Sequence, residues 1–144
     1  MIEIRKPTRE DIDLVTFDDE IWQRSNSDNC PSKEELKANY DFYNYFEFLG
    51  CYLNNKIIAL ATVGNEGNFH FEVLKPYRKY ARIALNGFVT VLNRDLFCEI
   101  PLLYKEVINF AKNNGFKEEG EILGRKFTKN GIDYKLIKLS FKNG

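Results

Sequence analysis

Two titratable side chains, His70 and Glu72, lie two residues apart in an aromatic stretch of the sequence. Successive side chains of a strand point to opposite faces, so these two share one face if the stretch is extended. The opposite face then carries Phe69, Phe71 and Val73. If the strand is central in a sheet, burial raises the pKa of Glu72 toward the value that a general base needs near neutral pH. The pattern favours acid–base chemistry, with Glu72 as the first candidate.

Each of the two residues also has a structural interpretation. Glu72 can instead pair with a neighbouring cation and serve only solubility or strand register. His70, the single histidine of the chain, titrates closest to neutral pH, but a single histidine on a strand is also a common structural residue. No second histidine, cysteine or carboxylate is clustered with it at the spacing of metal ligands, so the sequence predicts no metal site.

A basic turn follows this strand directly. Lys75 and Pro76 end the strand, and the sequence KPYRKYARIAL then passes into helical spacing. Free N–H groups and the positive end of a helix dipole attract anions at such a point. Turns that cradle phosphate usually contain glycine, because the main chain must approach the ligand closely, and this turn has none. Its cations Lys79 and Arg82 either bind an anion directly or are solvated charges at a helix start.

The elements that position these residues are predicted from hydrophobic periodicity, helix caps and turn signals. Strands are expected at residues 1–5, 46–53, 57–63, 68–73, 96–100, 122–128 and 132–141, and helices at about 8–15, 32–43, 80–92 and 103–113. The order β-α-α-β-β-β-α-β-α-β-β predicts an α+β fold with a central mixed sheet and helices on both faces.

The composition indicates a single domain over residues 1–144, which is long enough to bury a core without disulfides. Lys and Arg (21) balance Asp and Glu (21), so we expect no nucleic acid as principal ligand. No run of about 18 apolar residues occurs and the start lacks a signal peptide's apolar core, so we expect a cytoplasmic protein without a membrane partner. Cys30, Cys51 and Cys98 are scattered and are expected to be reduced thiols.

Two segments together with the order of elements resemble the GCN5-related N-acetyltransferase (GNAT) family over essentially the whole chain. The first is VLKPYRKYARIAL, residues 73–85, which is similar to the family's fourth strand, pyrophosphate turn and following helix. The second is IPLLYKEVINFAKNNGFKEEGEI, residues 100–122, which is similar to its fifth strand, fourth helix and Gly-Phe segment. The form of the second segment most resembles divergent acetyltransferase-like proteins encoded by tailed phages.

The resemblance implies acetyl-CoA as cosubstrate, in a V-shaped opening between the strands at residues 68–73 and 96–100. It implies that main-chain groups of Val73 and Leu74 pair with the pantetheine arm. The pyrophosphate is then expected at the start of the next helix, around Arg78, Lys79, Tyr80, Ala81, Arg82 and Ile83. Arg78 matches the first position of the family motif Arg/Gln-x-x-Gly-x-Gly/Ala. Ala81 and Ile83 stand where glycine or small residues are usual, so their side chains are expected to narrow the phosphate site.

The chain departs from the family pattern at two further positions. Tyr104 stands where the family often has Asn, and Ala111 stands where it often has the Tyr that protonates the leaving thiolate. Tyr104 is expected near the thioester sulfur and is either a replacement acid or a helix-packing residue. The transfer can also proceed without a dedicated acid if binding geometry and a strand N–H that polarises the thioester carbonyl supply most of the rate.

Two functions from different classes follow. The first is an acyltransferase that moves acetyl from acetyl-CoA to a primary amine of a small molecule or protein. The alternative is a catalytically degenerate GNAT-like binding or structural module, for example a phage protein in the host cytoplasm that docks on a host or virion partner. A homodimer is compatible with both, and the missing glycines, Asn and Tyr favour the alternative.

Overall fold

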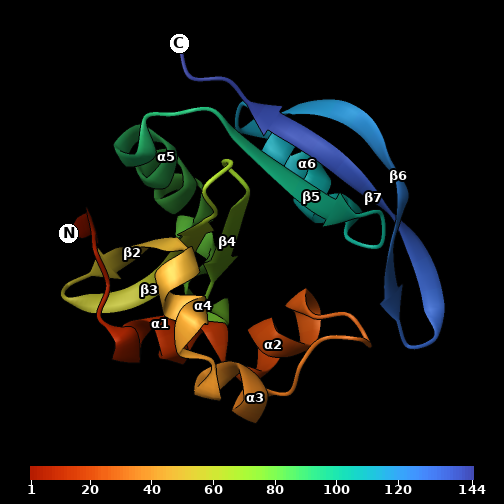
Figure 1. Cartoon of the computed structure of the whole chain (residues 1–144). Helices are drawn as coiled ribbons and strands as arrows, with labels where there is room; N and C mark the ends of the chain where they lie inside the picture. The colour runs from red at the N-terminus through yellow and green to blue at the C-terminus, as the bar shows by residue number, and fades with distance from the viewer.

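The computed structural model describes the main chain of residues 1–144 and every side chain except that of Tyr40. Figure 1 shows the elements in chain order. They are β1 (Ile2–Arg5), α1 (Arg9–Thr16), α2 (Asp19–Ser25), α3 (Lys33–Ala38), α4 (Tyr40–Tyr45), β2 (Glu47–Leu53), β3 (Lys56–Val63), β4 (Phe69–Val73), the 3₁₀ turn η1 (Lys75–Tyr80), α5 (Ala81–Leu92), β5 (Leu96–Pro101), α6 (Lys105–Asn113), β6 (Lys117–Lys129) and β7 (Ile132–Phe141). The predicted α+β class and the order of its strands are confirmed.

The helices before β2 are more numerous and shorter than the sequence predicts. After α1 the chain restarts as α2, because the Asp18 carboxylate accepts the N–H of Ile21 at 3.1 Å. The single helix expected over residues 32–43 is divided into α3 and α4, because Asn39 leaves the helical region and its side chain accepts the N–H of Asp41. Local side-chain caps of this kind compete with a continuous helix.

The last hairpin also differs from the prediction. β6 begins at Lys117, five residues before its expected start at Ile122, and its pairing with β7 shifts register twice. Gly120 and Gly124 both have positive φ, at 112° and 79°. These glycines allow the two register shifts, at which the strand bends. The glycines also explain why the sequence pattern predicted only the later part of β6 as a strand.

The strands form two antiparallel sheets, in the orders β1-β2-β3-β4 and β5-β7-β6. β4 and β5 are joined by a parallel bridge between Asn68 and Phe97, where the Phe97 N–H donates to the Gly67 carbonyl at 2.9 Å. Gly67 has φ 97°, and a Cβ there would lie 2.9 Å from the Asp95 carbonyl oxygen, so this close approach requires glycine. Beyond the bridge β4 and β5 diverge (Figure 1), as the resemblance predicted.

Helices cover both faces of the first sheet, as predicted. α5 packs against one face, with Phe88 fully buried. α1 and α2 pack against the other face, through the buried side chains Ile12, Val15 and Ile21. α6 contacts β5 and β6 of the second sheet. Among the described residues, no helix has the length and apolar character needed to span a membrane.

The loop after α2 is fastened to the β6–β7 turn. The Asp28 carboxylate accepts the N–H groups of Asn130 and Gly131, each at 2.9 Å, and the Asp28 N–H donates to the Thr128 carbonyl at 2.8 Å. Lys129 donates from its Nζ to the Asn26 carbonyl at 2.6 Å. These contacts, which we call the hairpin clasp, join α2 to the second sheet across the opening between β4 and β5.

Replacement of Phe88 by Ala should destabilise the fold by about 3–5 kcal/mol, because it leaves a cavity between α5 and the first sheet. Urea unfolding followed by circular dichroism measures this change. Val91→Ala on the same helix is the matched control, because Val91 is 53% exposed and should change the free energy of unfolding by less than about 0.5 kcal/mol. Equal effects of the two substitutions would contradict this description of the core.

Candidate active site

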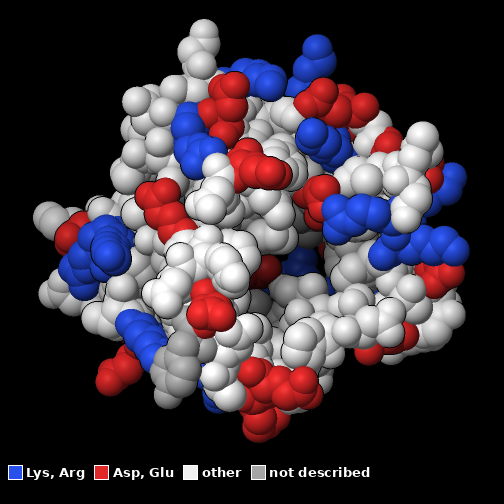
Figure 2. Space-filling view, viewed as in Figure 1, with Lys and Arg blue, Asp and Glu red and all other residues white. Residues whose placement is uncertain are grey.

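The divergence of β4 and β5 creates a cleft of about 670 Å³. Its walls come from α2, β4, the start of α5, β5, α6 and β6. Figure 2 shows the hollow near the centre of the molecule, with acidic and basic side chains around it. Large concave sites with a few converging polar groups are the usual form of a small-molecule site.

Main-chain groups of β4 face the gap between the sheets. The Leu74 N–H donates to the Ile58 carbonyl of β3 at 2.9 Å, and antiparallel pairing alternates hydrogen-bonded with non-hydrogen-bonded residues. The N–H and C=O groups of Phe71 and Val73 therefore point away from β3, toward the gap. Of the two residues expected to pair with pantetheine, Val73 presents its amide to the cleft, whereas the amide of Leu74 is already used.

Glu72 lies on the cleft face of β4 that is turned toward α2. Its Oε1 accepts a hydrogen bond from the Ser25 hydroxyl at 2.8 Å. Surrounding protein raises the pKa of Glu72 to about 7, and the Ser25 hydrogen bond and the nearby Arg24 guanidinium oppose this shift. The carboxyl group is thus half ionised near neutral pH, as a general base of the expected kind requires.

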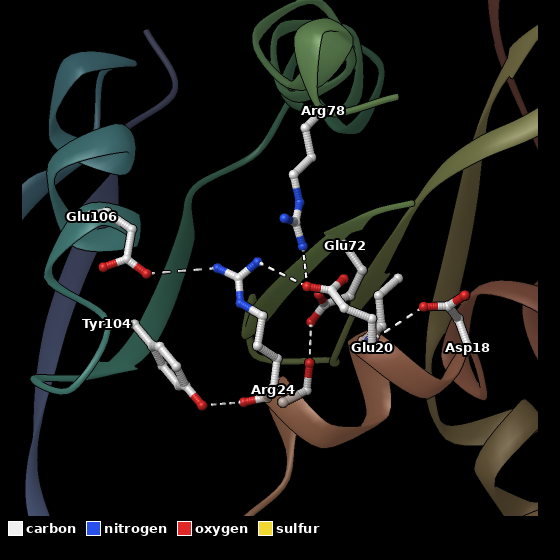
Figure 3. A network of polar contacts seen from close by, with 9 residues as sticks. Asp18, Glu20, Arg24, Glu72, Arg78, Tyr104 and Glu106 are labelled. Atoms are coloured by element: carbon white, nitrogen blue, oxygen red, sulfur yellow. Dashed lines mark hydrogen bonds and ion pairs between the residues drawn. The ribbon is translucent and has the colours of Figure 1, made fainter. Parts of the chain in front are cut away.

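An ion-pair network surrounds Glu72 (Figure 3). Arg78 of η1 donates to the Glu20 carboxylate of α2. Arg24 lies between two carboxylates, with its guanidinium 3.9 Å from Glu20 Oε2 and 3.8 Å from Glu106 Oε1. Contacts from α2 therefore reach both η1 and α6 across the cleft.

His70 faces the cleft on the same side of β4 as Glu72. The Asn68–Phe97 bridge sets the register of the two parallel strands, so two residues further on His70 lies opposite Glu99. Protein that surrounds the cleft-facing imidazole lowers the pKa of His70, and the negative charge of Glu99 opposes this change. Glu99 is itself paired with Arg125 of β6, whose Nη1 lies 2.6 Å from Glu99 Oε1.

Tyr104 precedes α6 and lies on the opposite wall of the cleft from Glu72. Its hydroxyl donates to the Arg24 carbonyl, and its ring contacts the Phe127 ring at a centroid distance of 6.2 Å. Burial raises the pKa of Tyr104, so the phenol keeps its proton at neutral pH. The structure thus brings all three candidate catalytic residues, His70, Glu72 and Tyr104, into one cleft.

The predicted phosphate turn is a 3₁₀ turn that continues into α5. The Ala81 N–H donates to the Arg78 carbonyl, and no side chain caps the start of α5. Arg78 points toward Glu20 in the cleft, whereas Lys79 lies with its Nζ 5.3 Å from the centre of the Tyr80 ring. Ala81 lines the cleft with its small side chain.

Arg82 and Ile83, the two other residues predicted to bind the pyrophosphate, lie in the first turn of α5 and are exposed, Ile83 by 52%. Neither forms part of the cleft wall. Of the two side chains that replace the usual glycines, Ala81 therefore lines the cleft and Ile83 lies outside it.

The cleft also contains a cysteine, Cys98, whose pKa is raised to about 12 by burial and by Glu99. A thiol with such a pKa is protonated and weakly nucleophilic at neutral pH. Within the part of the chain that the structure describes, no three His, Cys, Asp or Glu side chains gather as metal ligands would.

Sequence reasoning missed Glu20, Arg24, Ser25, Glu99 and Arg125. Ser25 and Glu20 lie on α2, a helix that the sequence pattern did not predict, and Ser25 donates to Glu72 from 47 positions earlier in the chain. Glu99 was accessible in principle, because alternation along β5 turns it to the cleft face once the register with β4 is known.

No family model and no curated protein matches this sequence. Solved structures do match it. The spermidine N-acetyltransferase of Vibrio cholerae, in complex with CoA and spermine, is similar with a TM-score of 0.77 at 18% identity, over 99% of this chain and 95% of that chain. A Salmonella typhimurium protein solved with its cofactor acetyl-CoA has a TM-score of 0.70 at 14% identity, over 99% and 94% of the two chains.

The Salmonella typhimurium acetyl transferase that modifies the N-terminal serine of a ribosomal protein is also similar, with a TM-score of 0.71 at 12% identity, over 96% of this chain and 93% of that chain. Such low identities show the fold alone. The chain has the GCN5-related N-acetyltransferase fold, which confirms the architecture that the sequence resemblance implied.

Glu72→Gln should stabilise the protein more at about pH 8 than at about pH 5. From pH 4.5 to about 7, folded Glu72 keeps a proton that the unfolded chain has released, so wild-type stability falls as the pH rises. The substituted amide carries no such proton, and the melting-temperature difference between variant and wild type should grow over this range. Glu47→Gln, at the exposed first residue of β2, is the control, and a pH-independent difference for Glu72→Gln would show that the pKa of Glu72 is not raised.

Proposed function

We propose that this protein is an N-acetyltransferase that moves acetyl from acetyl-CoA to a primary amine. The observation that carries the proposal is the position of Glu72, a carboxyl group of raised pKa beside the gap into which the Val73 amide points. The likeness to acetyltransferases solved with CoA or acetyl-CoA supports the same chemistry. Acetyl-CoA is the cosubstrate, and the amine acceptor enters from the α2 side.

The residues of the gap suit a pantetheine arm and its phosphates. The Phe71 and Val73 amides offer the pairing groups of an open strand edge. The uncapped start of α5 beside Ala81 offers N–H groups and the positive end of a helix dipole for the pyrophosphate, with Arg78, Lys79 and Arg82 as nearby cations. The phosphate part of this assignment requires Arg78 to leave Glu20, because the guanidinium is turned to the carboxylate in the structure.

The proposed chemistry begins with removal of a proton from the acceptor. An amine of pKa about 10.4 is mostly protonated at neutral pH, and only its neutral form attacks a carbonyl. The ionised Glu72 carboxylate takes the proton directly or through a water, and His70 on the same face is the second candidate for this role. Bound acetyl-CoA supplies the thioester carbonyl that the amine attacks.

The remaining steps use the main chain of β4 and the phenol of Tyr104. The amide of Phe71 or Val73 donates a hydrogen bond to the carbonyl oxygen as negative charge develops there. The C–N bond forms and the C–S bond breaks, and the nitrogen gives up its remaining extra proton to water. The departing thiolate receives a proton from water or from Tyr104, whose phenolate water then reprotonates. Burial raises the pKa of Tyr104, so the phenol is protonated at neutral pH before the transfer.

The alternative function is a GNAT-fold binding or structural module, including a phage protein that docks on a host or virion partner. Two observations favour it. Arg78 is engaged by Glu20, and the Ala81 N–H is used by the Arg78 carbonyl within η1. Both contacts reduce the number of groups that are free to receive a diphosphate.

Acetyl-CoA should raise the melting temperature of the protein by several degrees. A ligand at a hundred times its Kd stabilises the folded state by about 2.7 kcal/mol. Differential scanning fluorimetry with acetyl-CoA measures the shift, and Arg78→Ala should reduce it, because a phosphate ligand is lost. Arg5→Ala is the control, since β1 is at the opposite edge of its sheet from β4. No shift at millimolar acetyl-CoA would favour the binding module.

Glu72→Gln should lower kcat/KM for acetyl transfer by about 10²–10⁴-fold, the usual contribution of a general base. In the wild type, kcat/KM should fall as the pH drops below about 7, because protonated Glu72 cannot accept the proton. Ser25→Ala should move this midpoint to higher pH, since the Ser25 hydrogen bond stabilises the ionised form. The release of free CoA thiol, followed with a panel of amines, measures kcat/KM and its dependence on pH. An unchanged pH profile in Glu72→Gln would assign the base to another group.

A further inference from the structure

Arg24 is incompletely satisfied in the structure. A guanidinium has five N–H donors, and hydrogen bonds to oxygen need a separation of about 2.7–3.2 Å. Its two ion pairs measure 3.9 Å to Glu20 and 3.8 Å to Glu106, and the structure's described residues offer its guanidinium no closer partner. By contrast, Arg125, which also lines the cleft, lies 2.6 Å from its carboxylate.

Arg24 lies on the side of β4 where the acceptor is proposed to bind, and not on the side proposed for the cosubstrate's pyrophosphate. It precedes Ser25, whose hydroxyl donates to Glu72, and Figure 3 shows its guanidinium beside Glu72. α2 covers the same side of β4 as Glu72, whereas α5, where the pyrophosphate is proposed, packs on the other side. A group held by Arg24 would therefore lie next to the amine that Glu72 deprotonates.

The present partners of Arg24 are easily exchanged. Glu106 is exposed, with 70% of its side chain accessible, and Glu20 also receives the Arg78 guanidinium. Exposed ion pairs contribute little to stability, because water and salt screen them. A ligand carboxylate can thus replace Glu106 at small cost.

We propose that the acceptor is an amine with a carboxylate on a neighbouring carbon, as in an amino acid, and that Arg24 is the residue that selects it. The planar fork of an arginine matches the two oxygens of a carboxylate. Glu72 then receives the ammonium group of the same molecule. This inference rests on the proposed acetyl transfer and adds the substrate class to it.

A diamine fits this pocket less well. Its second positive charge would compete with Arg24 and Arg78 for the Glu20 carboxylate, with which both guanidinium groups are already paired. An amino acid places its carboxylate against Arg24 and its ammonium group against Glu72, and it leaves the net charge of the pocket unchanged.

The test compares pairs of amines that differ only by the carboxylate: leucine with 3-methylbutylamine, and phenylalanine with 2-phenylethylamine. The ratio of kcat/KM within each pair is measured for wild type, Arg24→Met and Arg24→Lys, and calorimetry gives the affinity of each amine for the same proteins. The two amines of a pair differ in basicity, but this difference is the same for every protein variant. A change in the kcat/KM ratio from one variant to another therefore reports the effect of the substitution. Arg5→Met, on the distant β1, is the matched control.

The wild type should bind and use the amino acid of each pair at least tenfold better. Arg24→Met should bring that ratio down by about 10- to 100-fold, the value of a charge-assisted hydrogen-bonded contact. Arg24→Lys should retain part of the preference, because it keeps the charge and loses the fork. The control should keep the wild-type ratio and melting temperature.

The proposal is overturned if the wild type shows no preference within the pairs, if Arg24→Met leaves the preference intact, or if this variant weakens CoA more than the amino acid. If no amine is acetylated while amino acids still bind through Arg24, the transferase proposal fails and the role of Arg24 as a carboxylate receptor stands. Calorimetry without acetyl-CoA separates these two results.

Discussion

The bridge between Asn68 and Phe97 is the constraint on which the rest of the structure depends. Parallel strands usually pair along their length, but here β4 and β5 are joined at their starts and then diverge. The bridge fixes which residues of the two strands face each other, and the divergence leaves main-chain amides of β4 without a neighbouring strand. A binding cleft therefore forms inside the sheet layer, where side chains from both strands and from α2 meet.

The sequence was sufficient to predict the strands and to place some of the residues of the candidate site. Alternation in FHFEV predicted that Glu72 and His70 share a face, and the structure turns both into the cleft. It was insufficient for the region before β2, because the cap at Asn39 divides a helix predicted over residues 32–43 and the cap at Asp18 begins a helix that was not predicted. Propensity and period are local quantities, whereas the breaks follow from single side-chain hydrogen bonds.

The charged residues around Glu72 were the least predictable part. Arg78 appears in the sequence as a phosphate ligand next to a helix start, yet its closest partner is Glu20, 58 positions earlier. No periodic pattern in the sequence predicts this ion pair, because it depends on how α2 packs beside β4. The same packing makes the pKa of Glu72 a balance between loss of water, which raises it, and the hydroxyl and guanidinium groups of α2 and η1, which lower it.

The hairpin clasp has a consequence for the order in which the molecule is completed. Asp28 precedes the amides that it binds, those of Asn130 and Gly131, by about a hundred residues. During synthesis on the ribosome α2 can reach β4 well before it can be fastened to the last hairpin. The cleft therefore lacks part of its wall until β5, α6 and β6 have been made, and the clasp itself forms only once Asn130 and Gly131 are present.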